Sequence, residues 1–126
     1  MNLSLDDAIM CAALILQGAG IDLKMPTTLS EFQQRPVSQR EIARADVPDN
    51  TLGLFYPLKP RGVVVADNWE ILVHEATHEL EFANHLPLRE DWAYFAQARA
   101  YDCSFRWQTD CPADETSCWV ATYTPR

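Results

Sequence analysis

The sequence predicts a small α+β domain with a mostly antiparallel sheet. Two stretches, residues 6–17 and 69–84, have the apolar spacing of helices. Two shorter stretches between them, residues 51–57 and 62–66, are rich in β-branched or aromatic residues and flank a turn-like "LKPR". The order helix, strand, short helices, hairpin, helix, helix is typical of an α+β domain. The 126 residues fit one domain, residues 1–126, with a modest core.

In the first half of the chain, residues 6–17 predict a helix that Ser4 caps and that ends at the glycines after residue 17. Residues 21–25 alternate apolar and polar side chains, which predicts a short strand. A short helix is expected from residue 27 or 28 to residue 34, because Pro36 prevents it from continuing. Residues 38–41 read as a capping box, which predicts one or two helical turns before Pro48.

In the second half, residues 51–57 and 62–66 predict a hairpin. Asp67 or Asn68 caps the next helix, which is expected to run to about residue 84. Pro87 and the acidic residues at 90 and 91 predict a further helix to about residue 107. Residues 108–126 predict a loop with a short strand around "CWVATY".

The composition and charge exclude some classes of partner. A hydrophobic fraction of 48 % and a charged fraction of 22 % indicate a globular chain. A net charge of -8 argues against binding to nucleic acid or to an anionic membrane, because both need clustered cations. The longest apolar run, residues 8–16, is too short to span a bilayer, and acidic residues precede it where a signal peptide has basic ones. The expected location is therefore the cytoplasm of the producing cell or of an infected host.

The four cysteines predict no structural zinc knuckle, because none stands in a C-x-x-C pair. They are Cys11, Cys103, Cys111 and Cys118. Two interpretations stay open: all four are reduced, or two of the last three bridge a loop. The reduced interpretation is favoured, since the sequence shows no export signal.

The main chemical motif is His74-Glu75-x-x-His78 within the helix expected at residues 69–84. Histidines four positions apart project from the same helical face, so both can reach one ion. Glu75 lies about 100° away around the axis, where it can act as a general base rather than as a ligand. The apolar residues of the helix share an opposite arc, which would anchor it in the core. The alternative is a solvated acidic face with two idle histidines.

A third ligand is expected from the next helix. Counted from Glu90, the side chains of Tyr94, Gln97 and Tyr101 fall within about 40° of its direction, which indicates the wall of a site. Asp91 is the nearest rival ligand, because it also precedes a tyrosine by three residues. The alternative role for Glu90 is an ordinary first-turn acid that stabilises the helix dipole.

Residues 51–107 resemble the gluzincins, zinc metallopeptidases whose third ligand is a glutamate on the helix after the HExxH helix. Third-ligand segments of this group often read E-x-x-A followed by Asp, Asn or Tyr, and Glu90 to Tyr94 has this form. The ImmA/IrrE-like peptidases and the minigluzincins share the expected element order. The resemblance implies a zincin-like fold, in which the hairpin packs on the HExxH helix and a ligand helix follows.

The resemblance also implies a site and an activity. Zn²⁺ would be held by His74, His78 and Glu90, with a water molecule at the fourth position. Glu75 would take the proton of that water as it attacks a peptide carbonyl. The implied protein is a zinc-dependent metallopeptidase, a hydrolase that cleaves peptide bonds in a specific protein substrate.

Two further features follow from the same resemblance. Tyr94 or Tyr101 could donate a hydrogen bond to the oxyanion. A protein or peptide substrate would pair with the strand at residues 62–66, or with its hairpin partner, as an added strand.

Two other function classes remain open at this stage. The chain could be a non-catalytic protein-binding module on a zincin scaffold, with structural or vestigial zinc. It could also be a carrier or inhibitor whose acidic surface docks a basic partner. That surface would include Glu79, Glu81, Asp110, Asp114 and Glu115. Retention of Glu75 favours catalysis over binding alone, because a binding protein needs no base there. The sequence leaves the oligomeric state open.

Overall fold

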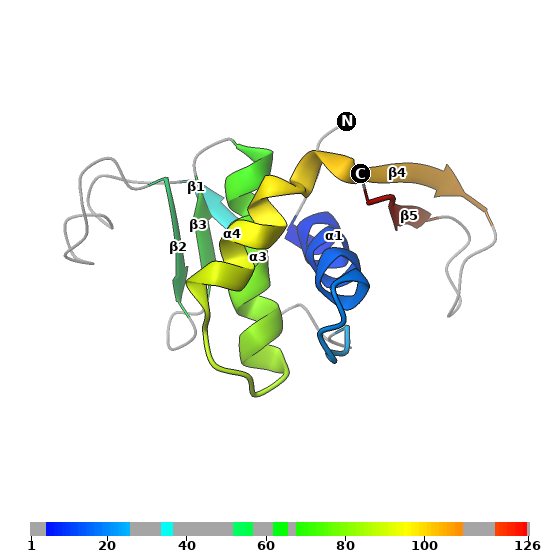
Figure 1. Ribbon diagram of the computed structural model, residues 1–126. Coiled ribbons are helices and arrows are strands. Elements are labelled where there is room, and N and C mark those ends of the chain that lie inside the picture. Colours follow the sequence, from blue (N-terminus) through cyan, green and yellow to red (C-terminus); the bar gives the residue numbers. More distant parts are fainter. Residues whose placement is uncertain are drawn as a thin grey trace.

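The computed structural model describes residues 5–25, 34–36, 52–56, 62–65, 68–109 and 118–125 (Figure 1). The elements follow in the order α1 (Leu5–Gly18), β1 (Gln34–Pro36), β2 (Gly53–Tyr56), β3 (Gly62–Val65), α3 (Trp69–Ala83), α4 (Glu90–Ala98), the 3₁₀ helix η1 (Ala100–Asp102), β4 (Cys103–Gln108) and β5 (Cys118–Tyr123). The predicted α+β class is confirmed.

The strands form two separate sheets. In the first, with the order β1-β3-β2, β3 pairs antiparallel with β2 and parallel with β1. The predicted hairpin is thus confirmed, with Gly53 opposite Val65. Gln34 was expected to end a helix, but it begins β1; the rest of that predicted helix and the predicted capping box lie outside the described residues. β4 and β5 form the second sheet, an antiparallel pair.

Helix α3 is the centre of the molecule. Figure 1 shows it between the first sheet and α1, with α4 crossing over it and the β4–β5 pair beyond α1. All residues from Leu72 to Glu81 are buried as a result. The apolar run of α1 packs against α3, where Ile9, Leu16 and Leu80 are fully enclosed. The apolar stretch at residues 8–16 is therefore a buried core helix, as predicted, and no described helix is long and apolar enough to cross a membrane.

Both ends of α3 lie where the sequence predicts them. The Asn68 side chain accepts a hydrogen bond from the backbone N–H of Ile71 at the start. At the other end, the N–H of Leu86 donates to the carbonyl of Glu81 and that of His85 to Phe82, the pattern of a Schellman turn. This turn places His85 in the left-handed region, with φ 57°.

Replacing His85 with glycine is expected to stabilise the protein by about 0.5–1 kcal/mol, because glycine adopts this conformation without a clash at Cβ. His85 is exposed and lies outside the candidate site, so the change removes no core contact. Thermal unfolding should show a midpoint higher by a few degrees. His85→Ala is the control and should give no such gain; an equal gain in both variants would contradict the conformational explanation.

Two further predictions about secondary structure are wrong. Residues 21–25 form no strand, because Lys24 uses its backbone N–H and carbonyl to bond the side chain of Asn84 at the end of α3, at 2.7 and 2.9 Å. The last helix ends at Ala98 instead of residue 107. The chain then turns through η1 into β4, which pairs with the β-branched and aromatic residues of β5. The strand predicted around "CWVATY" is confirmed as β5.

The prediction of reduced cysteines is wrong for two of the four. Cys11 of α1 and Cys103 of β4 form a disulfide, with Cα atoms 5.8 Å apart. The alternative pairing within the last three cysteines is also wrong for Cys103. Disulfides persist in oxidising compartments, so this bond does not support the cytoplasmic expectation.

Glu79 is a buried carboxyl without a partner. Its side chain is 1 % exposed, and neither oxygen has a hydrogen-bond partner in the described part of the chain. Burial, helped by the charge of Asp6, raises the pKa of Glu79 to about 8. Because this pKa lies above the ordinary value of 4.5, the ionisation of Glu79 costs no stability below pH 4.5; its cost grows as the pH rises from there to about 8 and is fully present above.

Replacing Glu79 with glutamine should therefore stabilise the protein more at high pH than at low pH. The expected gain is small at pH 5 and about 1–3 kcal/mol at pH 8.5, since the amide has no charge to bury. Thermal or urea unfolding of both proteins at the two pH values measures it. A gain that is independent of pH would contradict the assignment to ionisation.

Candidate metal centre

Helix α3 brings His74 and His78 together on one face. Their ring centroids are 5.2 Å apart, and the two residues are only 8 % and 6 % exposed. Phe55 of β2 lies 6.2 Å from the His78 ring, and Tyr94 of α4 lies 4.7 Å from the His74 ring. The alternative of a solvated face is therefore wrong, because both histidines are buried.

Glu90, the first residue of α4, completes the cluster. Its Oε1 lies 2.7 Å from Nε2 of His78, and its Oε2 lies 3.2 Å from Nε2 of His74. One ligand atom from each of the three residues lies within 4.8 Å of the others, so the group could hold a metal ion. Asp91 is not part of this group: its carboxylate forms a two-point ion pair with Arg89 at 2.6 and 3.0 Å.

The other nitrogen of each imidazole is also fixed. Nδ1 of His74 donates to Oε1 of Gln97 at 2.8 Å, and Nδ1 of His78 donates to Oε1 of Glu81 at 2.7 Å. Because these acceptors hold the proton on Nδ1, the Nε2 atoms are the ones available to a ligand. Both Nε2 atoms face Glu90.

The pKa values of the two histidines are shifted in opposite directions. Burial lowers the pKa of His74 and outweighs the bond to Gln97 and the charge of Glu90. Burial would also lower the pKa of His78, but the bond to Glu81 and the nearby carboxylates together outweigh it and raise this pKa. A cation at the centre would replace the proton that these carboxylates attract to His78.

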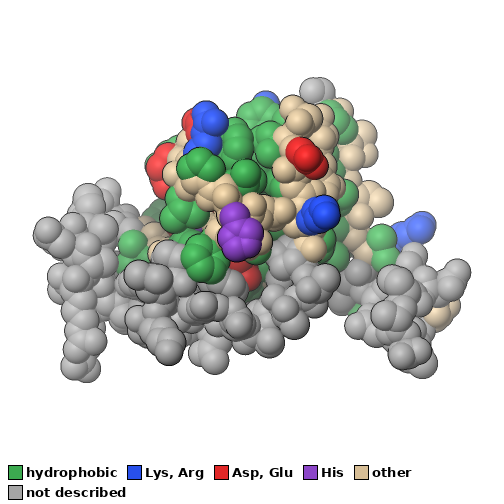
Figure 2. Space-filling model, turned by 90° about the horizontal axis from the view of Figure 1, so that it is seen from below, with side chains coloured by type: hydrophobic (Ala, Val, Ile, Leu, Met, Phe, Trp, Pro, Cys, Tyr) green, Lys and Arg blue, Asp and Glu red, His purple; other side chains and the backbone are tan. Residues whose placement is uncertain are grey.

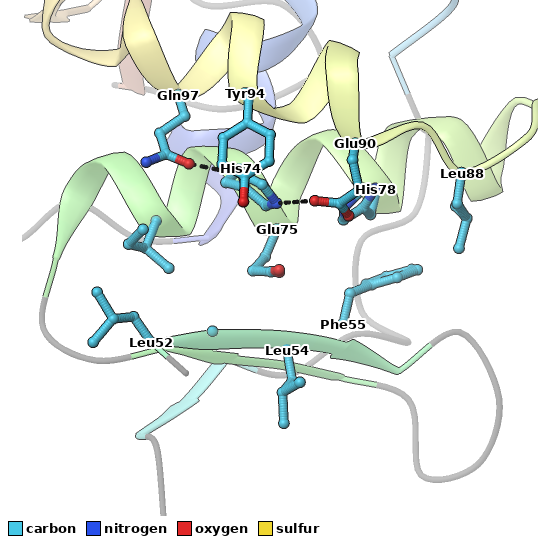
Figure 3. Close-up of a pocket in the computed structure, with 12 residues that line it drawn as sticks. Leu52, Leu54, Phe55, His74, Glu75, His78, Leu88, Glu90, Tyr94 and Gln97 are labelled. Carbon is cyan, nitrogen blue, oxygen red and sulfur yellow. Dashed lines mark hydrogen bonds and ion pairs between the residues drawn. The ribbon is translucent and has the colours of Figure 1, made fainter. Parts of the chain in front are cut away.

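Glu75 lies beneath the cluster and points toward β2 (Figure 3). It is 5 % exposed, and its Oε2 has no hydrogen-bond partner among the described residues. Burial, with a smaller contribution from the charge of Glu90, raises the pKa of Glu75 to about 7. A carboxylate with such a pKa can accept and release a proton near neutral pH.

A pocket of about 560 Å³ gives access to these groups. Helices α3 and α4 form one wall, and residues 52–55 at the start of β2 form the opposite wall. Figure 3 shows Leu52 at one end of the opening, and Phe55 and Leu88 at the other. The polar cluster thus lines the wall formed by α3 and α4, and the opposite wall is apolar.

The structure brings only one of the two predicted tyrosines to this pocket. Tyr94 lines it and stacks edge-on against His74. Tyr101 lies in η1 and lines a different cavity, between α1, α4 and β5. The helical spacing that predicted Tyr101 does not apply, because α4 ends at Ala98.

The residues present fit a zinc ion. Two neutral imidazoles and one carboxylate are a ligand set found in catalytic zinc sites, where one position stays open. The Glu90 side chain is 64 % exposed, so it has room to move to the distance that an ion between it and the imidazoles requires. The buried oxygen of Glu75 that lacks a partner is the kind of group that a bound water would satisfy.

Glu81 is the residue that sequence reasoning missed. It was assigned to an acidic surface together with Glu79, but the two side chains are 0 % and 1 % exposed; the other three acids of that surface lie outside the described residues. The available signal was the spacing His78-x-x-Glu81, since residues three apart on a helix are neighbours.

The chain matches no family model, no curated protein and no solved structure. The likeness to gluzincins therefore rests on the residues and geometry of the site.

Replacing Glu90 with alanine is expected to weaken zinc binding by roughly one to a few orders of magnitude, while Asp91→Ala changes it little. The reason is that Glu90 faces both Nε2 atoms, whereas Asp91 is paired with Arg89. Competition with a chromophoric chelator measures both affinities. The reverse order of effects would make Asp91 the third ligand.

Proposed function

We propose that this protein is a zinc-dependent metallopeptidase with a gluzincin-like site on a zincin-like scaffold. The observation that carries the proposal is the shared pocket of the His74, His78 and Glu90 cluster with the buried carboxyl of Glu75. A metal-binding group alone would need no base beside it. The pairing of the two is what hydrolysis of a peptide bond requires.

Each residue has a role in this proposal. The Nε2 atoms of His74 and His78 and the carboxylate of Glu90 would hold the ion. A bound zinc ion supplies Lewis acidity that makes water acidic near neutral pH and polarises a carbonyl. Glu75 accepts the proton from water and passes it to the leaving amine. The Tyr94 hydroxyl, at the pocket wall, donates a hydrogen bond to the developing oxyanion.

The substrate class follows from the pocket wall opposite the helices. Among the described strands, β2 is at the end of the order β1-β3-β2 and residues 52–55 line the cleft, whereas β3 is in the middle of the sheet. An extended peptide can add to such an edge through main-chain hydrogen bonds. Of the two strands predicted to receive a substrate, β2 is therefore the better candidate. The apolar side chains of Leu52, Phe55 and Leu88 would contact residues next to the scissile bond.

The test compares zinc-loaded and zinc-free protein on a mixture of unstructured peptides, with mass spectrometry to find new termini. We expect cleavage at a restricted set of sites by the loaded protein, loss of cleavage after chelation, and recovery when zinc is restored. A folded, zinc-loaded protein that cleaves no peptide and no candidate protein would favour the binding-module alternative.

A further inference from the structure

Glu81 makes three hydrogen bonds at the point where α3 meets the chain leading to α4. Oε1 accepts the Nδ1–H of His78 at 2.7 Å, and Oε2 accepts the backbone N–H of Arg89 at 2.8 Å. Its backbone carbonyl accepts the N–H of Leu86, also at 2.8 Å. A carboxylate is almost never fully buried unless it is paired, and here both oxygens of a 0 % exposed side chain are paired.

The bond to Arg89 fixes the start of the ligand helix. Arg89 is the N-cap of α4, and its side chain makes no capping hydrogen bond. The next residue is Glu90, whose Cα lies one peptide unit, about 3.8 Å, further along. Holding the backbone of Arg89 therefore limits where the Glu90 carboxylate can be. This helps to explain how Glu90 meets both histidines although only a short turn joins α3 to α4.

We propose that Glu81 is a positioning residue that assembles the metal centre from two helices. Through one oxygen it orients His78, and through the other it holds the first turn of α4, so that Nε2 of His78 and the carboxylate of Glu90 face the same point. The inference rests on the metal site of the proposed function, but not on peptidase activity. Glu81 touches neither the ion nor a substrate in this role.

Glutamine is the informative replacement, because it keeps the size of the side chain but accepts at one end only. If its carbonyl accepts the N–H of Arg89, its NH₂ faces Nδ1 of His78. That arrangement favours the imidazole form with the proton on Nε2, which cannot bind a metal. If its carbonyl faces His78 instead, the NH₂ opposes the N–H of Arg89. In the first case the bond to His78 is reversed in direction, and in the second the bond to Arg89 is lost.

The first measurement is the zinc affinity of Glu81→Gln, determined by chelator competition below the unfolding temperature. We expect a 10- to 100-fold weaker affinity, the usual effect of changing an outer-shell partner of a ligand. Glu79→Gln is the matched control, because Glu79 is on the same helix and similarly buried but has no hydrogen-bond partner in the part of the chain that the structure describes. It should leave the affinity within about threefold of the parent.

A second measurement needs no variant. Arg89 is an exposed residue, so burial alone would not slow the hydrogen exchange of its backbone amide. Slow exchange there would indicate the hydrogen bond to Glu81. We expect protection that increases further when zinc binds. Unprotected exchange at Arg89 would overturn the inference even if Glu81→Gln fails to fold.

The outcomes separate this inference from the metal site itself. If the parent binds no zinc, the proposed function fails. If the parent binds zinc and a folded Glu81→Gln variant binds it equally well, the metal site stands and the positioning role is wrong. A purely structural role for Glu81 would lower the unfolding temperature of the variant without changing the zinc affinity of its folded form.

Discussion

Replacing His74 or His78 with alanine is expected to remove zinc binding from a protein that otherwise holds about one ion per chain. Each change leaves two ligands where a zinc site with an open position has three. The loss of affinity should therefore exceed the roughly 10- to 100-fold effect of outer-shell changes. Elemental analysis gives the zinc content. Thermal unfolding adds a second readout, because zinc at 100 times its Kd should stabilise only the parent, by about 2.7 kcal/mol.

The matched control is His85→Ala. This third histidine is exposed and lies outside the cluster. Figure 2 views the molecule from below; the described part of this face shows hydrophobic side chains and a few separate charged groups. His85→Ala should keep the full zinc content. Absence of zinc from the parent, even after reconstitution, would contradict every catalytic role assigned here.

Replacing Glu75 with glutamine is expected to lower hydrolysis of the substrate by roughly 10²–10⁴, the usual contribution of a positioned acid–base. The amide keeps the size of the side chain and can still accept a hydrogen bond, but it cannot take a proton. Zinc content and folding should stay nearly unchanged, since Glu75 is not among the three candidate ligands. Rates of peptide cleavage, measured beside the zinc content of the same sample, give the comparison.

Glu79→Gln is again the control, because it removes a buried carboxyl from the same helix outside the pocket. Its cleavage rate should match that of the parent. If Glu75→Gln retains full biological effect, the protein acts by binding another protein, however tightly it holds zinc.

The part of the site within α3 could be predicted from the sequence because it is local. A helix of known period fixes the relative directions of His74, Glu75 and His78 before any packing is considered. The Asn68 cap and the buried helix at residues 8–16 follow from similarly local rules. The sequence also favours Glu90 over Asp91 as the further ligand. The structure adds that Glu90 faces both histidines, whereas Asp91 pairs with Arg89.

The features that were missed depend on contacts between distant residues. Residues 21–25 have a strand pattern, yet their backbone bonds Asn84, sixty positions away. The disulfide joins cysteines separated by 92 residues, and no spacing rule predicts such a pair. Tyr101 was placed in the site by extending a helix that ends at Ala98, where the chain turns to pair β4 with β5.

The sequence by itself determined which groups stand close together: two imidazoles and a carboxyl group on one helix, with a further acid on the next. Only the tertiary structure decided how these groups are held. Burial of α3 made Glu81 a hydrogen-bond partner of His78 and Arg89, and left Glu79 without a hydrogen-bond partner among the described residues. The physical reason is that helical period sets direction within an element, whereas desolvation and hydrogen-bond pairing depend on what packs against it.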